Sequence, residues 1–193
     1  MKNITENEMK FIMTILKNPE KELNASNIAK LIEMTSMGAL KIARKLEKEG
    51  IIYSRQIGKS IIYKLTFNNS YTKQYVKFLL QREAEHSNAY IKRWINELKK
   101  IKNSKLIILF GSILIKHDNA KDVDILVVID KRNFKKINEE ISSINLMNNK
   151  KIHPVFQTEE DFRKNIEEDK VILNAIKGIV VSGEETFIEL IEK

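Results

Sequence analysis

The sequence predicts an α+β protein in three parts: a helical N-terminal domain closed by a β-hairpin (residues 1–68), a helical linker (69–103) and a C-terminal domain in which helices flank a mixed sheet (104–193). Three observations predict this division. Apolar residues recur at helical spacing in the first part, and two strand-like runs then flank a single glycine. After the linker, apolar strand-like runs alternate with amphipathic helical segments.

Three helices are predicted in the first part, over residues 5–17, 26–34 and 37–49. Thr5 and Glu8 have the spacing of a capping box at the start of the first helix. Thr35 and Ser36 form a short break before the third helix and can cap it. Gly50 follows as a typical residue beyond a helix C-terminus, so the third helix is expected to stop there.

Two strand-like runs, IIYSRQ and SIIYKLTF, follow around Ile57-Gly58-Lys59 and predict a hairpin. Three helices followed by a hairpin resemble the winged-helix family of transcription regulators. Within residues 5–66, the stretch NIAKLIEMTSMGALKIARKLEKEGII is similar to its helix-turn-helix and first wing strand. The resemblance implies binding of double-stranded DNA, with basic side chains neutralising phosphates. The candidate DNA-binding residues are Ser36, Lys41, Arg44 and Lys45 on the third helix and Arg55 and Lys59 on the hairpin.

The net charge of +8 is unevenly distributed along the chain. Residues 1–68 hold 12 basic and 7 acidic side chains, and residues 69–104 hold 8 and 3. Residues 105–193 hold 14 basic and 16 acidic side chains, so only the front of the chain is basic. A basic N-terminal part predicts that this part binds a polyanion. Two alternatives are that the lysines only face solvent, and that the winged helix serves protein docking or dimerisation.

Composition excludes several other classes of protein. The chain has no cysteine, which excludes disulfides and thiolate metal sites and is typical of a cytoplasmic protein. No apolar run is long enough for a membrane span, and the polar N-terminus lacks a signal-peptide core. The three histidines are scattered, which argues against a histidine-rich zinc site.

The linker segment 70–100 contains no glycine or proline and carries aromatic residues at helical spacing. It is predicted to form either one long helix or two helices broken near His86-Ser87-Asn88. Its aromatic side chains are expected to pack either on a domain of the same chain or on a second subunit of a homodimer.

Two aspartates interrupt an otherwise apolar strand in the third part. Residues 105–110 and 123–129 are predicted strands, and Gly111-Ser112 forms a turn into a short helix between them. Because side chains alternate along a strand, Asp122 and Asp124 point to one face, about 6–7 Å apart. Such a pair is tolerated when it shares a divalent cation, and Mg²⁺ prefers carboxylates together with phosphate oxygens. A glycine lets phosphate approach the backbone, and a serine hydroxyl donates to it.

The pattern hydrophobic, Gly, Ser, nine residues, Asp, hydrophobic, Asp, hydrophobic resembles the signature of the polymerase-beta-type nucleotidyltransferase superfamily, especially its minimal prokaryotic members. The resemblance extends over about 104–190, where a helix at 133–148, a strand at 151–157, a helix at 159–167 and a closing segment GIVVSGEETFIEL are expected after the two strands. It implies that Gly111 and Ser112 bind the nucleoside triphosphate, that Asp122 and Asp124 bind Mg²⁺ (or Mn²⁺), and that Ser112 and both aspartates are catalytic. The implied reaction transfers a nucleoside monophosphate from an NTP to an acceptor, either a protein hydroxyl, as in the antitoxin members, or a small molecule.

The sequence departs from this family at one position. Active members usually place a third carboxylate on the next strand, but here that strand reads KKIHPVFQT and has no acid. His153 stands near the expected position and is either a base for the incoming hydroxyl or an ordinary strand residue. The alternative to an enzyme is a non-catalytic transcriptional regulator whose degenerate transferase domain senses nucleotide or mediates dimerisation. A partner-binding scaffold with neither activity is a third hypothesis.

Overall fold

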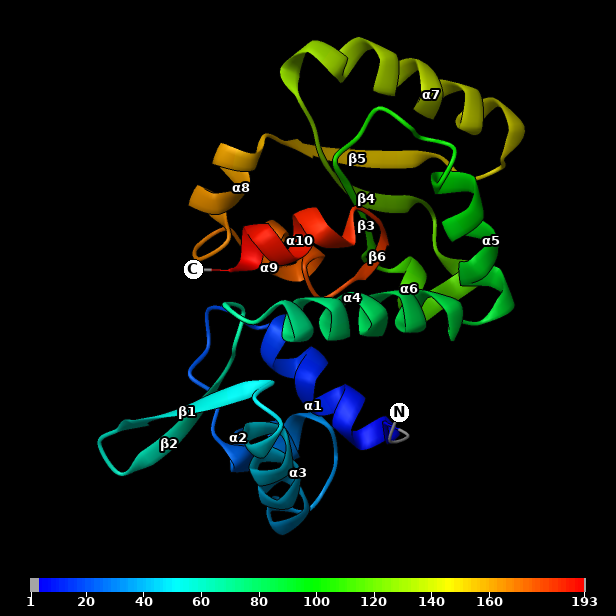
Figure 1. The fold of residues 1–193 in the computed structure, drawn as a ribbon. Helices are drawn as coiled ribbons and strands as arrows, with labels where there is room; N and C mark the ends of the chain where they lie inside the picture. The colour runs from blue at the N-terminus through cyan, green and yellow to red at the C-terminus, as the bar shows by residue number, and fades with distance from the viewer. Residues whose placement is uncertain (1–3, 193) are drawn as a thin grey trace. The chain divides into compact units, whose positions relative to one another are not determined.

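The computed structural model describes residues 4–192. The chain divides into two compact units, and the boundary between them lies at Leu79 and Leu80, inside helix α4 (Ser70–Glu85). The α+β class with a mixed sheet is confirmed (Figure 1). No helix in the described part of the chain combines the length and the apolar composition that crossing a membrane requires.

The N-terminal unit consists of three helices, a two-stranded hairpin and the first part of α4. Its elements before α4 are α1 (Glu6–Leu16), α2 (Ala25–Leu31), α3 (Ser36–Lys48), β1 (Ile52–Ile57) and β2 (Ser60–Leu65). The hairpin is antiparallel, and its turn at Gly58 and Lys59 lies where the sequence placed it. The predicted order of three helices and a hairpin is therefore present in the structure.

Side-chain caps define where these helices begin. The Glu8 amide donates to Thr5 Oγ1 over 3.2 Å and the Thr5 amide donates to Glu8 Oε2 over 3.0 Å, which confirms the capping box. Thr35 caps α3 by accepting from the Gly38 amide. Helix α2 ends earlier than the sequence predicted because Glu33 takes a left-handed backbone conformation, with φ of 57°, and the Met34 amide bonds back to Ala29.

The C-terminal unit contains the second part of α4, a sheet and its covering helices. Its further helices and strands are α5 (Ala89–Leu98), β3 (Leu106–Phe110), α6 (Ile113–Lys116), β4 (Val123–Val128), α7 (Phe134–Met147), β5 (Ile152–Gln157), α8 (Glu159–Asn165), α9 (Lys170–Ala175), β6 (Ile179–Ser182) and α10 (Glu184–Ile191), with 3-10 turns at His117–Asn119 and Lys131–Asn133. Helix α9 was not among the predicted elements. Helix α5 begins after a break at 86–88, so the two-helix alternative for the linker holds, and Asn88 caps α5.

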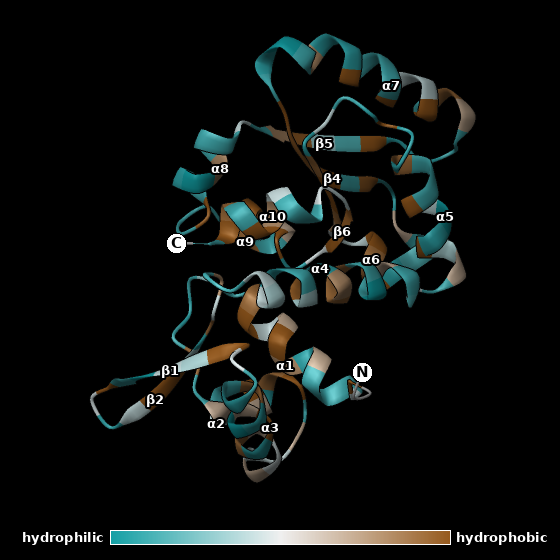
Figure 2. Cartoon of the chain, viewed as in Figure 1, coloured by the Kyte–Doolittle hydropathy of each residue, from teal (hydrophilic) through white to brown (hydrophobic). Residues whose placement is uncertain are grey.

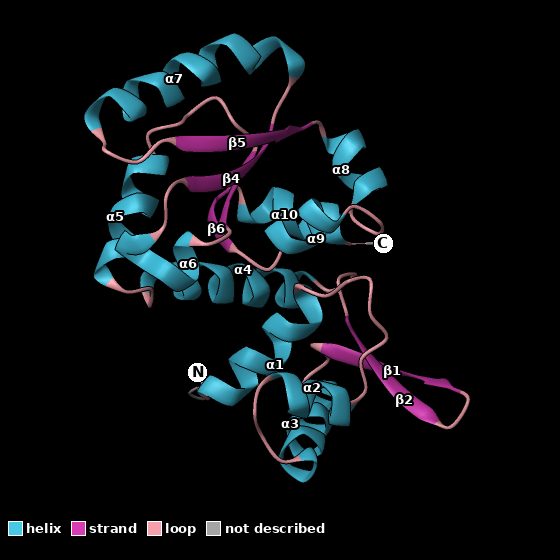
Figure 3. Cartoon of the chain, turned by 180° about the vertical axis from the view of Figure 1, so that it is seen from behind, coloured by secondary structure: helices cyan, strands magenta, loops and turns pink. Residues whose placement is uncertain are grey.

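The sheet has the strand order β5-β4-β3-β6, and Figure 3 shows its strands from behind. Strand β3 is antiparallel to both β4 and β6, whereas β4 and β5 are parallel. Strand β5 is an edge strand, and this position tolerates Pro154, which has no backbone N–H to donate to a neighbouring strand. This order places the end of β3 beside the starts of β4 and β5.

Helices cover both faces of this sheet and pack hydrophobic side chains against it. Ile107, Leu109 and Ile125 are fully buried in a cluster with residues of α5 and α7, such as Trp94 and Ile141. The other face contacts α9 and α10, which lie together with α8 beside the sheet in Figure 1. Figure 2 shows that helix α7 carries both hydrophobic and hydrophilic residues along its length. Burial of each of these aliphatic side chains contributes about 1.5–3 kcal/mol to the free energy of unfolding. The sheet is therefore a stable base for the residues at the ends of its strands.

Candidate active site

Three polar side chains meet at one end of the strands of the C-terminal sheet. Asp124, in β4, is paired in register with Phe110 at the end of β3 and with His153 near the start of β5. Asp122 lies directly before β4. One ligand atom from each of Asp122, Asp124 and His153 lies within 4.8 Å of the others. Because paired residues on neighbouring strands point to the same face, the backbone register brings these three groups together.

The Gly-Ser turn lies against the same carboxylates. Gly111 follows β3 with a φ of 81°, and a Cβ built on it would lie 2.3 Å from Asp124 Oδ2. Only glycine combines this backbone conformation with such a close approach of the Asp124 carboxylate. Ser112 comes next, at the start of α6, and its side chain makes no capping hydrogen bond there. The turn and the two aspartates therefore form one site.

The electrostatics of the site favour a cation. Burial raises the pKa of Asp124, the negative charge of Asp122 raises it further, and His153 lowers it in part. His153 Nδ1 lies 3.3 Å from Asp122 Oδ2, and the side chains of these two residues are 62% and 33% exposed. Two carboxylates and an imidazole are donors that divalent cations accept, and the site is open enough for a bound ion to keep further oxygen ligands. The residues present therefore fit a divalent metal.

No carboxylate replaces the missing third acid on β5. Among the described residues, the next acids along the chain are Glu159 and Glu160, in the first turn of α8. Glu159 pairs with Lys105 Nζ at 2.5 Å, and Glu160 pairs with Lys164 Nζ at 2.6 Å. The role of capping α8 belongs to Thr158 with Asp161, and not to the two glutamates. His153 is thus the β5 side chain that faces the aspartate pair.

Lys150 supports the site from outside it, and sequence reasoning did not single it out. Its ammonium donates to the carbonyl oxygen of Asp118 over 2.7 Å and to the carbonyl of Ala120. The loop that carries Asp122 is thereby held to the segment before β5. A lysine some thirty residues from its partners gives no signal in the sequence, because the contact depends on the parallel pairing of β4 and β5.

The candidate DNA-binding residues differ in how they are presented within the N-terminal unit. Ser36, Lys41 and Arg44 are exposed on α3, and Arg55 and Lys59 are exposed on the hairpin. The structure gives Lys45 another neighbour, because its ammonium pairs with the carboxylate of Glu8 on α1. Five of the six candidates are therefore presented to solvent, while Lys45 lies in an intramolecular ion pair.

Comparison with known families bears on the C-terminal unit. Residues 91–183 match the nucleotidyltransferase domain family. The match covers slightly less than half of the chain, from α5 to the residue after β6, and includes the whole sheet with Gly111, both aspartates and His153. This supports a nucleotidyltransferase-like function for the C-terminal part and an NTP as its substrate. Domains of this family typically use divalent metals, which agrees with the acidic cluster. No curated protein matches the sequence closely enough to be a relative.

Proposed function

We propose that the C-terminal domain transfers a nucleoside monophosphate from an NTP to an acceptor hydroxyl, with Mg²⁺ or Mn²⁺ held by Asp122 and Asp124. The observation that carries the proposal is the contact of Gly111 with the Asp124 carboxylate. It brings the Gly-Ser turn and the two carboxylates together at one end of the sheet strands, which supports binding of phosphate and a cation in one site. The domain match over the same residues supports this assignment.

Each residue has a distinct role in this proposal. The Gly111 backbone and the Ser112 hydroxyl orient the phosphates of the NTP, while Asp122 and Asp124 ligate the cation. When bound, the cation neutralises charge on the phosphate oxygens. The acceptor oxygen bonds to the α-phosphorus as the bond to the pyrophosphate oxygen breaks, and pyrophosphate leaves. His153, exposed beside Asp122, takes the proton of the acceptor hydroxyl.

The test combines nucleotide binding with pyrophosphate release. The full chain is incubated with Mg²⁺ or Mn²⁺ and each labelled NTP, first alone and then with protein and small-molecule acceptors. We expect metal-dependent release that the Asp122→Asn/Asp124→Asn double variant abolishes. Asp118→Asn is the matched control, because this exposed aspartate lies in the same loop and interacts there through its carbonyl oxygen. Release that survives in the double variant contradicts the proposal.

A second candidate function is a non-catalytic regulator in which the domain senses nucleotide or mediates dimerisation. The absence of a carboxylate on β5 favours it, since His153 occupies the register position opposite Asp124. Metal-dependent nucleotide binding without pyrophosphate release, across a panel of acceptors, distinguishes this function from catalysis. A dimer formed through the aromatic residues of the linker belongs to the same hypothesis and is measured by sedimentation.

We further propose that the N-terminal unit is a winged helix that binds double-stranded DNA through α3 and the hairpin. Three helices precede a hairpin, and exposed basic residues on α3 and the hairpin are available to phosphates. Affinity for duplex DNA should fall steeply with salt, and Arg44→Ala should reduce the slope of log affinity against log salt by about one unit. Lys177→Ala, which removes an exposed lysine of the other unit, is the control. Undetectable binding at low salt rules out this part of the proposal.

A further inference from the structure

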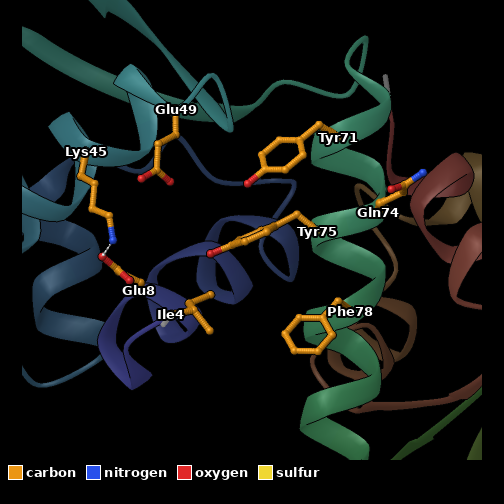
Figure 4. A pocket seen from close by; sticks show the side chains of 8 residues that line it. All are labelled: Ile4, Glu8, Lys45, Glu49, Tyr71, Gln74, Tyr75 and Phe78. Carbon is orange, nitrogen blue, oxygen red and sulfur yellow. Dashed lines mark hydrogen bonds and ion pairs between the residues drawn. The ribbon is translucent and has the colours of Figure 1, made fainter. Parts of the chain in front are cut away.

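A groove in the N-terminal unit has no role in the nucleotidyl transfer or the DNA binding proposed above. It has a volume of about 560 Å³, within the range of about 300–1,000 Å³ that is usual for small-molecule sites. Residues of α1, of the C-terminal end of α3 and of α4 line it, together with Ile4 (Figure 4). All of its lining residues belong to the unit that ends at Leu79.

One wall of the groove is aromatic. Tyr71, Tyr75 and Phe78 lie at positions i, i+4 and i+7 of α4 and therefore share one helix face. Tyr71 is 53% exposed and Phe78 is 50% exposed, so the hydrophobic core of the unit does not use them fully. The rings of Tyr71 and Tyr75 lie 6.0 Å apart between centroids. Exposed aromatic faces grouped in a concavity are a feature of binding surfaces.

The opposite wall is polar and carries a negative charge. Glu8 and Lys45 form an ion pair there, and Glu49 adds a second carboxylate one helical turn after Lys45. Figure 4 shows the hydroxyl ends of Tyr71 and Tyr75 directed toward this wall. Burial raises the pKa of Glu8, but hydrogen bonds from Lys45 and Thr5 outweigh it and lower the pKa, so Glu8 is ionised at neutral pH. Two carboxylates face one ammonium.

We propose that this groove binds a small organic cation whose apolar body is aromatic. The aromatic wall supplies apolar area and ring faces that attract positive charge, and the excess carboxylate complements that charge. This site is distinct from the nucleotide site and from the exposed basic surface of α3. The proposal depends on neither proposed function.

The test uses two probes of nearly equal shape and opposite charge, tetraphenylphosphonium and tetraphenylborate, titrated calorimetrically into the full chain. We expect the cation to bind at least ~10-fold more tightly than the anion. The comparison is stringent because the chain carries a net charge of +8 and attracts anions in general. Equal or tighter binding of tetraphenylborate overturns the proposal.

Variants locate the bound cation. Glu49→Gln should weaken tetraphenylphosphonium binding about 5-fold, and Tyr71→Ala should weaken it by a similar factor. Glu22→Gln and Tyr53→Ala are the matched controls, since both alter exposed residues of the same unit that do not line the groove. Glu49 is exposed, so its variant keeps the test valid if Tyr71→Ala does not fold. An unchanged dissociation constant for folded Glu49→Gln and Tyr71→Ala overturns the proposal.

A second copy of the chain is the other occupant that the aromatic wall could accept. Sedimentation at several protein concentrations, with and without tetraphenylphosphonium, separates the two. A dimer that Tyr71→Ala dissociates, together with no cation binding by the wild-type chain, overturns the small-molecule proposal in favour of an interface.

Discussion

Gly111 meets two requirements at once, and each has a physical cause in the site. Its backbone φ of 81° lies in the left-handed region, and the carboxylate of Asp124 occupies the place where a side chain would begin. Gly58 has a similar φ of 58°, yet nothing lies within 4 Å of the Cβ it would carry. Comparing substitutions at these two glycines therefore distinguishes the free energy cost of the backbone conformation from the cost of displacing the Asp124 carboxylate.

Gly111→Ala should destabilise the C-terminal unit by about 2–4 kcal/mol and weaken binding of Mn²⁺ at least ~10-fold, because the new Cβ displaces the Asp124 carboxylate. Gly58→Ala should cost only about 1 kcal/mol and leave metal affinity unchanged. Chemical denaturation and calorimetric titration of the full chain measure both effects. Wild-type Mn²⁺ affinity in the Gly111 variant would show that the turn and the metal site are separate.

His153 faces Asp122 from β5, the strand on which the family resemblance leads us to expect a third acid. His153→Asp adds a third carboxylate to the pair, so we expect Mg²⁺ affinity to rise about 10-fold. His86→Asp introduces the same charge at an exposed residue outside the site and serves as the control. Calorimetry with Mg²⁺ checks the prediction, and equal affinities in the two variants would place residue 153 outside the cation's reach.

At the level of elements, local patterns predicted most helices and strands but not their pairing. The capping box at Thr5, the hairpin around Gly58 and the strands on each side of Gly111-Ser112 all depend on nearby residues, which sequence periodicity reports. Helix α9 was missed, and the position of β6 beside β3 could not be predicted. Strand order depends on contacts between distant residues, and the same holds for Lys150, whose partners lie across a parallel strand pair.

The site followed the same division between local and distant information. Proximity of Asp122 and Asp124 follows from their i, i+2 spacing at the start of β4, so the sequence was sufficient for it. The ion pair of Lys45 with Glu8 joins α3 to α1 and carries no local signal. Its formation explains why a residue that the sequence grouped with the DNA-binding candidates is only partly exposed and lies in an intramolecular ion pair.

Helices α1 and α3 are joined by this Glu8–Lys45 pair, and its contribution depends on pH. Although burial raises the pKa of Glu8, hydrogen bonds from Lys45 and Thr5 make the net shift downward from 4.5. A lowered pKa in the folded state contributes stability above pH 4.5, and that stability is lost as the pH falls through the folded value. The Lys45 side chain is 37% exposed, so solvent screens part of the attraction.

Glu8→Gln keeps an acceptor for the Thr5 amide but removes the charge. We therefore expect it to destabilise the N-terminal unit by about 1 kcal/mol at neutral pH, and by progressively less as the pH falls below 4.5. Hydrogen exchange at the amides of α1 and α3 reports on this unit separately from the other. Glu22→Gln, at an exposed position, is the control, and a difference that persists undiminished at low pH would contradict the linkage argument.

At the scale of the whole molecule, the two halves of the sequence differ in net charge and in their candidate functional residues. Residues 1–104 carry an excess of basic side chains, with 20 basic and 10 acidic, whereas residues 105–193 are slightly acidic and contain the aspartate pair. The two proposed ligands, duplex DNA and a metal-bound nucleotide, are therefore assigned to different parts of the sequence. We expect the Asp122→Asn/Asp124→Asn variant to retain duplex DNA affinity and Arg44→Ala to retain nucleotide affinity, which anisotropy measurements with both ligands on both variants will check.

The most direct test of the central claim is calorimetric titration of an NTP into the full chain with and without Mn²⁺. We expect NTP binding to require the metal, to be lost in the Asp122→Asn/Asp124→Asn variant and to be retained in Asp118→Asn. Binding of equal strength without metal, or in the double variant, would contradict the claim that this aspartate pair holds the cation beside the Gly111-Ser112 turn.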